Sequence, residues 1–253
     1  MDSGFYAACA GLRAQSQALE VSAHNLANLN TTGFRGQQAT FQSLLAVSRP
    51  TVPNVLGNVL NSATNNFGVL EGTHLDMTAG NLQTTGNPLD VAIEGGGFFA
   101  IQTARGTRYT RNGSFQVSSS GQLVTAAGDL VLGNVTLKEK GGIAVPAGDV
   151  SIASDGTLSV NGAVAGSIQL VEFAPGTQLT SEGGSLIAAP EGSAKPVLQP
   201  TMKQDTLESS NVNPISSVVT LIGVQRQAEM LQRCMSLLDS EFNQIASTQL
   251  AKV

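Results

Sequence analysis

Residues 224–245 read VQRQAEMLQRCMSLLDSEFNQI, and this stretch decides how the C-terminal part of the chain folds. Apolar residues recur in it at intervals of seven. They are Val224, Leu231, Leu238 and Ile245, with Ala228, Met235 and Phe242 at the intermediate positions. A seven-residue repeat keeps one face of a helix turned toward a partner helix. The stretch therefore predicts a long helix with an apolar seam.

This helix is expected to begin at Pro214 and to run to about Gln249. Asn213 is a good N-cap for it, and proline is favoured at the first helical position. At 1.5 Å per residue the helix would be roughly 50 Å long, which exceeds the width of a small β-domain. The part that extends beyond such a domain needs a partner, for which a second helix of the same chain is the nearest candidate.

The N-terminus carries the same kind of repeat. Its seven-residue series is Phe5, Leu12, Leu19 and Leu26, with Cys9, Ser16 and Ala23 between them. We expect a helix from about Ser3 to Asn28, ended by residues 28–33, whose Asn and Gly tolerate the left-handed backbone of a helix C-terminus. The two helices can pair with each other or with helices of neighbouring subunits. This layout suits a subunit of a polymer better than an enzyme.

The composition argues against several classes of function. Charged residues make up only 12% of the chain, against roughly 25% in an average soluble protein, and neutral surfaces suit packing against copies of the same chain. The net charge of −5 and the lack of a basic block argue against nucleic acid as a partner. No apolar run is long enough to predict a transmembrane helix. The first residues lack the basic region of a secretory signal, so no cleaved signal peptide is expected.

Residues from about 86 to 208 carry β signals. Short apolar runs alternate with turn signals and not with helical patterns, which favours a mainly antiparallel β-domain over an α/β fold. The runs are Val91–Ile93, Phe98–Ile101, Leu130–Leu132, Val150–Ile152, Leu158–Val160 and Ile168–Phe173. Turns are expected at Ser120-Gly121, Gly128-Asp129, Asp155-Gly156 and Asn161-Gly162.

The pair Asn112-Gly113 is a further turn signal and the strongest of its kind in the chain. It lies between Arg108–Thr110 and Phe115–Val117, which have the composition of strands. Asn-Gly supplies the positive φ that a two-residue hairpin turn needs at both positions. The sequence therefore predicts a β-hairpin here, with Asn112 and Gly113 as its structural turn.

The expected fold class is α+β, with long N- and C-terminal helices pairing as a coiled-coil-like unit around a central, mainly antiparallel β-domain. We assign residues 1–45 and 209–253 to the helical domain, 46–85 to an extended connection and 86–208 to the β-domain. The connection is rich in Pro, Gly and Asn. It is expected to contain at most short strands and to become ordered when subunits pack.

The sequence points to no catalytic, cofactor or metal site. Gly95–Gly97 precedes a strand-like run and not a helix, so a tight turn or bulge is favoured over a phosphate-binding loop. His24 and His74 have no Cys or acidic residue at metal-ligand spacing. Cys9 and Cys234 are interpreted as small buried hydrophobic residues on the helical seams. A carboxylate pair for glycoside hydrolysis leaves no spacing to test and is the one catalytic alternative left open.

Four blocks of sequence, in order, resemble the bacterial flagellar rod and hook proteins. The first is AHNLANLNTTGFR at residues 23–35, and the second is GNPLDVAI at residues 86–93 followed by GFF at 97–99. The third is YTRNGSF at residues 109–115 with GQLVT at 121–125, and the fourth is ESSNVNP at residues 208–214 with Gln225-Arg226. Together the blocks extend over most of the chain, so the resemblance is specific.

The resemblance implies a structural axial subunit of the flagellar basal-body rod, which spans the periplasm. In that family the terminal helices form the inner tube, part of a torque-transmitting drive shaft, and the β-domain packs outside it. The implied partners are copies of itself, other rod proteins and the flagellar type III export apparatus. Neither a cofactor nor an enzymatic activity is implied.

The subtype is less sharply defined than the family. Length and the single β region are most similar to the proximal-rod subunit, with a distal-rod or hook-type subunit as the alternative. Gln227-Ala228 stand where the family usually has an aromatic residue, and Ser118–Ser120 where an acidic residue is common. These departures blur the subtype and leave the family unaffected.

Outside this family, the remaining alternative is a secreted β-domain enzyme or adhesin with helical tails. The termini of a polymer subunit should be protease-sensitive in the monomer because each seam lacks its partners, whereas an enzyme should keep both helices docked. The expected assembly seam consists of Phe5, Leu12, Leu19, Leu26, Val224, Ala228, Leu231, Met235, Leu238, Phe242 and Ile245.

Overall fold

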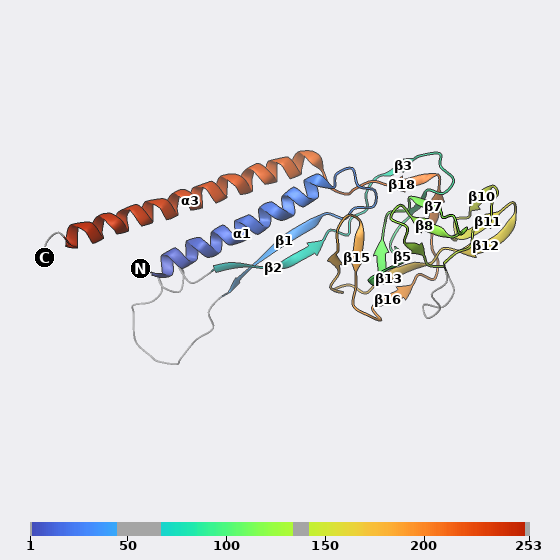
Figure 1. The fold of residues 1–253 in the computed structure, drawn as a ribbon, viewed down its shortest axis with the longest axis horizontal. Helices are drawn as coiled ribbons and strands as arrows, with labels where there is room; N and C mark the ends of the chain where they lie inside the picture. Colours follow the sequence, from blue (N-terminus) through green and yellow to red (C-terminus); the bar gives the residue numbers. More distant parts are fainter. Residues whose placement is uncertain (1, 45–66, 134–141, 251–253) are drawn as a thin grey trace. The chain divides into compact units, whose positions relative to one another are not determined.

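The chain folds into two units that are interleaved along the sequence (Figure 1). The computed structural model describes residues 2–44, 67–133 and 142–250 of the 253 residues. The first unit combines residues 1–26, 37–73 and 214–253, and the second combines residues 27–36 and 74–213. The chain therefore passes between the units after Leu26, Gly36, Thr73 and Asn213.

The first unit contains two long helices and a two-stranded sheet. Helix α1 spans Asp2–Ala27 and helix α3 spans Pro214–Leu250, while strands β1 (Gln37–Leu44) and β2 (Phe67–Leu75) pair with each other. Both helices fall within about one residue of the expected bounds, because periodicity and caps are local signals. Neither is long and apolar enough to cross a membrane over its described residues. Strand β2 has nine residues, so the expectation of at most short strands before residue 75 is wrong.

The second unit is built from short strands whose pairings are antiparallel throughout the described residues, which confirms the expected α+β class. The strands are β3 (Leu82–Thr84), β4 (Val91–Ile93), β5 (Phe98–Thr103), β6 (Gly106–Thr110), β7 (Phe115–Val117), β8 (Leu123–Thr125), β9 (Leu130–Val131), β10 (Val150–Ile152), β11 (Thr157–Val160), β12 (Ala163–Ser167), β13 (Leu170–Phe173), β14 (Thr180–Ser181), β15 (Leu186–Ala188), β16 (Ala194–Pro196), β17 (Met202–Gln204) and β18 (Thr206–Glu208).

The largest sheet has the strand order β14-β15-β6-β5-β9-β8-β7, and β13 pairs with both β5 and β16. Strands β10, β11 and β12 form a separate sheet, and two small sheets pair β17 with β4 and β18 with β3. Strands β17 and β18 are separated only by Asp205, which has a φ of 57°. This left-handed residue redirects the chain, so consecutive strands pair with different partners.

Strand β5 lies between the two apolar clusters of this unit. Phe99 belongs to one cluster and meets Phe115 edge to face, with 5.1 Å between ring centroids. Phe98 belongs to the other cluster and packs near Phe173 at a centroid distance of 5.6 Å. Successive residues of a strand point to opposite faces, so β5 contributes to both sides of its sheet. All six apolar runs expected to be strands contribute to the strands of this unit.

The four turns expected between strands are confirmed by their glycines. Gly121, Gly128, Gly156 and Gly162 all have positive φ. Asn161 and Gly162 form a two-residue connection between β11 and β12, with φ values of 51° and 81°. This is the hairpin geometry for which Asn-Gly is suited.

The prediction of a hairpin at Asn112-Gly113 is wrong. Strand β6 pairs with β5 and β15, strand β7 pairs with β8, and neither turn residue has a positive φ. The Val91 amide instead donates to the Gly113 carbonyl at 3.1 Å, and a Cβ on Gly113 would lie 1.7 Å from the Val91 oxygen. Glycine occupies position 113 because another backbone approaches it closely.

Candidate functional site

Half-buried residues follow one stripe along α3. They are Ser217, Leu221, Val224, Ala228, Leu231 and Met235, and every other residue from Pro214 to Leu237 is exposed. Spacings of four and three alternate along this stripe, as on one face of a helix that meets a partner. Four of its members belong to the seam expected from the sequence. The side chains of Leu238, Phe242 and Ile245 lie outside the described residues.

The most buried residues of α1 are small. Ala14 and Ala18 are each 7% exposed, and Ser22 is 9% exposed, at intervals of four residues on one face. Gly11 lies on the same face, where an added Cβ would be 3.5 Å from Leu231 Cδ1. Within the first unit, α1 therefore meets the half-buried stripe of α3 at Gly11.

The N-terminal seam residues lie beside this small-residue face. Cys9, Leu12, Leu19 and Leu26 are half-buried, Ser16 and Ala23 are exposed, and the side chain of Phe5 is outside the described residues. Both cysteines are free, and Cys234 is exposed, so the expectation that it is buried is wrong. Cys234 is not part of the half-buried stripe of α3.

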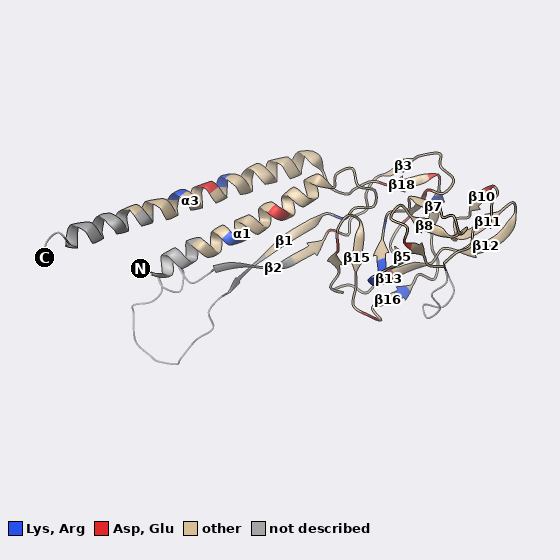
Figure 2. Cartoon of the chain, viewed as in Figure 1, with Lys and Arg blue, Asp and Glu red and all other residues tan. Residues whose placement is uncertain are grey.

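The side of α3 away from the half-buried stripe carries exposed apolar side chains. They are Ile215, Val218, Val219, Ile222, Met230 and Leu237, each between 41 and 76% exposed. Charged residues are sparse along the described parts of both helices (Figure 2). A series of apolar side chains left in water along one helix face indicates an interaction surface.

Asn25 closes the loop that follows α1. Its Oδ1 accepts the Gln37 amide at 2.8 Å, and its Nδ2 donates to the Gln37 carbonyl at 2.7 Å. One side chain thus satisfies both backbone groups of the first residue of β1, as a neighbouring strand would. Within the first unit, the end of α1 and the start of β1 are held together by this pair of bonds.

In the second unit, Glu208 at the end of β18 lies at the centre of a buried charge cluster. Its carboxylate is 2.8 Å from Arg35 Nη2 and 3.1 Å from Arg111 Nη1, and the three side chains are at most 5% exposed. The Gly80 amide also donates to this carboxylate at 2.8 Å. Charge-assisted bonds of this kind are stronger than bonds between neutral groups.

Arg111 and Arg35 extend this cluster to other backbone segments. Arg111 donates to the Gly95 carbonyl at 2.7 Å, and Arg35 donates to the Thr78 carbonyl. Burial lowers the pKa of the Arg111 guanidinium, and the charge of Glu208 acts in the opposite direction. Because buried ions are costly without partners, each member of the cluster depends on the others.

Asn211 binds two further segments close to this cluster. Its Oδ1 accepts the Gly36 amide at 2.8 Å, and its Nδ2 donates to the Asp76 carbonyl at 2.9 Å and to the Thr78 carbonyl at 3.0 Å. The Asp76 amide in turn donates to the Gly36 carbonyl at 2.7 Å. We refer to residues 33–36, 76–80, 111 and 208–211 together as the junction.

Two glycines allow the backbones of the junction to touch. A Cβ on Gly33, which has a φ of 66°, would lie 2.3 Å from the Arg111 carbonyl carbon. A Cβ on Gly80 would lie 1.9 Å from the Ser209 oxygen. Any larger residue at either position would force the segments apart.

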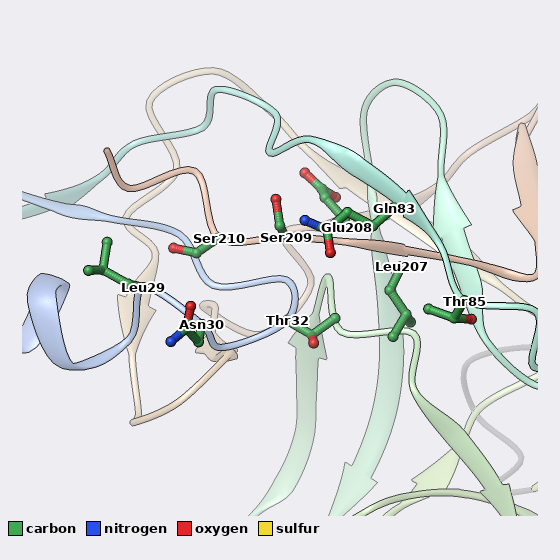
Figure 3. A pocket seen from close by; sticks show the side chains of 9 residues that line it. All are labelled: Leu29, Asn30, Thr32, Gln83, Thr85, Leu207, Glu208, Ser209 and Ser210. Atoms are coloured by element: carbon green, nitrogen blue, oxygen red, sulfur yellow. The ribbon is translucent and has the colours of Figure 1, made fainter. Parts of the chain in front are cut away.

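A polar pocket of about 290 Å³ opens beside the junction (Figure 3). It is lined by Leu29, Asn30, Thr32, Gln83, Thr85, Leu207, Glu208, Ser209 and Ser210. Glu208 is the one ionisable side chain among these lining residues, and two arginines already bind it. The pocket therefore offers neutral hydrogen-bonding groups and no available acid or base.

Two further candidates from the sequence are the glycine run before β5 and a metal site. Gly95 and Gly97 have positive φ between β4 and β5, and this run leads into a strand and not a helix, in agreement with the tight turn or bulge expected there. Within residues 2–44, 67–133 and 142–250, no group of three or more His, Cys, Asp or Glu side chains is placed to hold a metal ion.

Comparison with known proteins assigns the chain to a family. Residues 5–35 match the model for flagella basal body rod protein, residues 92–160 the flagellar hook protein FlgE/F/G D1 domain, and residues 203–247 the flagellar basal body rod FlgEFG protein C-terminal region. The flagellar basal-body rod protein FlgF of Escherichia coli (strain K12) is 36% identical over 260 residues, covering 94% of this chain and 95% of the relative. The chain belongs to the flagellar basal-body rod proteins. FlgG of Agrobacterium fabrum is 34% identical over 96% of the chain and 97% of the relative, and FlgF of Mesorhizobium japonicum is 33% identical over 90% of each.

As a rod protein the chain is a structural axial subunit of the flagellar basal body and not an enzyme. The matched regions include the features described above. The first runs along α1 to Arg35, and the last contains Glu208, Asn211 and most of α3. The resemblance stated from the sequence is thus confirmed at the level of the rod family.

The junction of this rod protein is not predicted by any local pattern, although several of its residues stand in the family blocks. Arg35 and Glu208 lie 173 positions apart, so no local period connects them. The available signal was an arginine that ends one family block and a glutamate that begins another, in a chain poor in charges. Opposite charges in such positions could have been proposed as a pair.

Proposed function

We propose that this rod subunit polymerises through α1 and α3, whose apolar surfaces form contacts both within a subunit and between subunits. The observation that supports the proposal is the two-sided character of α3. One stripe, which includes Leu231, is half-buried within its own unit, while the side with Ile222 and Val219 leaves apolar groups in water. Burying such groups against a neighbouring helix is favourable by about 25 cal/mol per Å².

The seam of the assembled helices, on this proposal, consists of the residues predicted from the sequence. Coiled-coil-like pairing of α1 with α3 is supported by the alternating spacing of four and three along α3 and by the approach of Gly11 to Leu231. The small face of α1, with Ala14 and Ala18, lets the two axes approach closely.

The family resemblance also suggests a place for the subunit in the flagellum. We propose that it belongs to the proximal part of the rod, in the periplasm, and that it is exported by the flagellar type III apparatus without cleavage of a signal peptide. The single β unit supports the proximal position, as in the resemblance drawn from the sequence. Mass measurement of the chain recovered from isolated basal bodies tests the export proposal, because signal cleavage would shorten its N-terminus.

Cross-linking in isolated basal bodies tests the helix proposal. In a background with Cys9→Ser and Cys234→Ser, a single cysteine replaces Ile222 on α3 or Val164 on β12, which is 72% exposed. A short thiol-specific cross-linker should join Ile222→Cys subunits to rod neighbours in high yield. Cross-linking that occurs at position 164 and not at position 222 would contradict polymerisation through the helices.

A further inference from the structure

Four chain segments connect the helices of a rod subunit to its β-domain, and force between the two passes along these segments. These cross between the units after Leu26, Gly36, Thr73 and Asn213. Strand β2 continues across the third crossing, but the first and last strands that lie wholly in the second unit are short. Strands β3 and β18 have three residues each and form a sheet of two strands. Two-stranded pairs of this size are marginal alone, so one segment pulled by itself would open after few hydrogen bonds.

The junction connects three of the four segments side to side. Gly36 stands at the second crossing, Asp76 comes three residues after the third, and Asn211 comes two residues before the fourth. Asn211 binds both of the others, and these two are bonded to each other at 2.7 Å. The three segments therefore close a ring of hydrogen bonds.

The remaining segment is held on the helix side. It leaves α1 after Leu26, and Asn25 binds both backbone groups of Gln37, the first residue past the second crossing. All four segments thus have a cross-connection within a few residues of the point where they leave a unit.

The charge cluster fixes the ring to the body of the β-domain. Glu208 accepts from Arg35, one residue before Gly36, and from Arg111, which follows β6 in the largest sheet. The Gly33 amide donates to the Glu208 carbonyl at 2.8 Å. Displacing the segment with Gly36 would separate buried opposite charges, which resists movement more strongly than a neutral contact does.

We propose that the junction makes these segments respond to force as one body, with Asn211 as the residue that positions them. The inference rests on the proposed function as a rod subunit, and it adds a mechanical role for the residues of the junction. Torque would be shared by several segments, so that no single short strand is peeled from the β-domain. Asn211 is suited to this because it presents both an acceptor and two donors to separate segments.

Hydrogen exchange on the purified full-length chain tests whether the segments are coupled. Asn211→Ala removes the side-chain oxygen that accepts the Gly36 amide. The substitution does not touch the second bond, in which the Asp76 amide donates to the Gly36 carbonyl. We expect exchange at both amides to accelerate roughly tenfold or more, while the Leu123 amide, bonded to Ile143 in the core, keeps its rate. Asn30→Ala, an exposed asparagine of the same region, is the matched control. Acceleration at Gly36 alone would overturn the coupling.

Motility against load tests the mechanical role. Cells that carry Asn211→Ala should assemble rods, swim near the normal speed in dilute medium, and lose at least half of that speed in viscous medium relative to Asn30→Ala. Asn25→Asp is a second variant, and it lies outside the second unit. It replaces the amide group that donates to the Gln37 carbonyl by a carboxylate oxygen, which cannot donate. This variant should show the same loss of speed in viscous medium. Equal speeds in viscous medium, or rods that fail to assemble, would overturn the proposal. Normal rods in cells lacking the chain would instead contradict the proposed function.

Discussion

At the scale of the residue, position 113 requires glycine, but for another reason than the predicted hairpin turn. Its carbonyl accepts the Val91 amide, and an added Cβ would lie 1.7 Å from the Val91 oxygen. We expect Gly113→Ala to lower the free energy of unfolding by about 3 kcal/mol, because two backbones must separate. Gly96→Ala is the control, since an added Cβ there meets no atom within 4 Å and its φ is not positive. Urea denaturation measures both, and equal midpoints would contradict the close approach.

Glu208 provides a second prediction at the same scale. Glu208→Gln keeps the shape of the side chain but leaves Arg35 and Arg111 buried without a counter-charge, so we expect a loss of about 3–5 kcal/mol of stability. The matched control is Glu182→Gln. Glu182 also binds two arginines, Arg105 and Arg108, but its side chain is 25% exposed, so solvent screens the pair and its substitution should cost far less stability than that of Glu208. Thermal or urea denaturation of both variants decides; comparable losses would show that burial does not set the strength of the cluster.

At the scale of the element, α3 has a regularly spaced half-buried stripe on one side and exposed apolar side chains on the other. The half-buried stripe of α3 predicts that Leu231→Asp places a charge in an apolar contact, at several kcal/mol unless water reaches it. We expect incomplete basal bodies and loss of motility. Gln232→Asp adds the same charge one residue further on, at an exposed position, and should leave assembly intact. Electron microscopy of isolated basal bodies and swimming assays provide the measurement, and normal rods with Leu231→Asp would exclude the stripe as an assembly contact.

At the scale of the whole molecule, the two units predict how the chain can be divided. A fragment of residues 74–213 lacks the 27–36 segment of the second unit, and with it Arg35, but it keeps the large sheet and the Glu208–Arg111 pair, so it should melt in one cooperative transition. A fragment of residues 75–207 retains Arg111 but lacks its buried counter-ion, so it should melt at a lower temperature. Calorimetry of the two fragments tests this. Identical transitions would mean that the β-domain does not depend on its C-terminal strand end.

The sequence by itself determined the two helices, the six apolar runs that contribute strands and most of the turns. Seven-residue spacing, the Asn213 cap and the glycines at positions 121, 128, 156 and 162 act over a few residues, so they can be interpreted without knowledge of the fold. The family blocks likewise determined the class of protein. The three-part division at residues 45, 85 and 208 remains a prediction, as does the assembly seam.

Only the tertiary structure decided which of these local signals are used and what the charged residues do. Asn112-Gly113 and Asn161-Gly162 have the same two letters, but of the two only the second forms a hairpin, because β6 and β7 each pair with other strands. The contact of Asn211 with Gly36 joins residues 175 positions apart. Such pairs depend on where the sheets bring distant segments together, and no local period in the sequence encodes that.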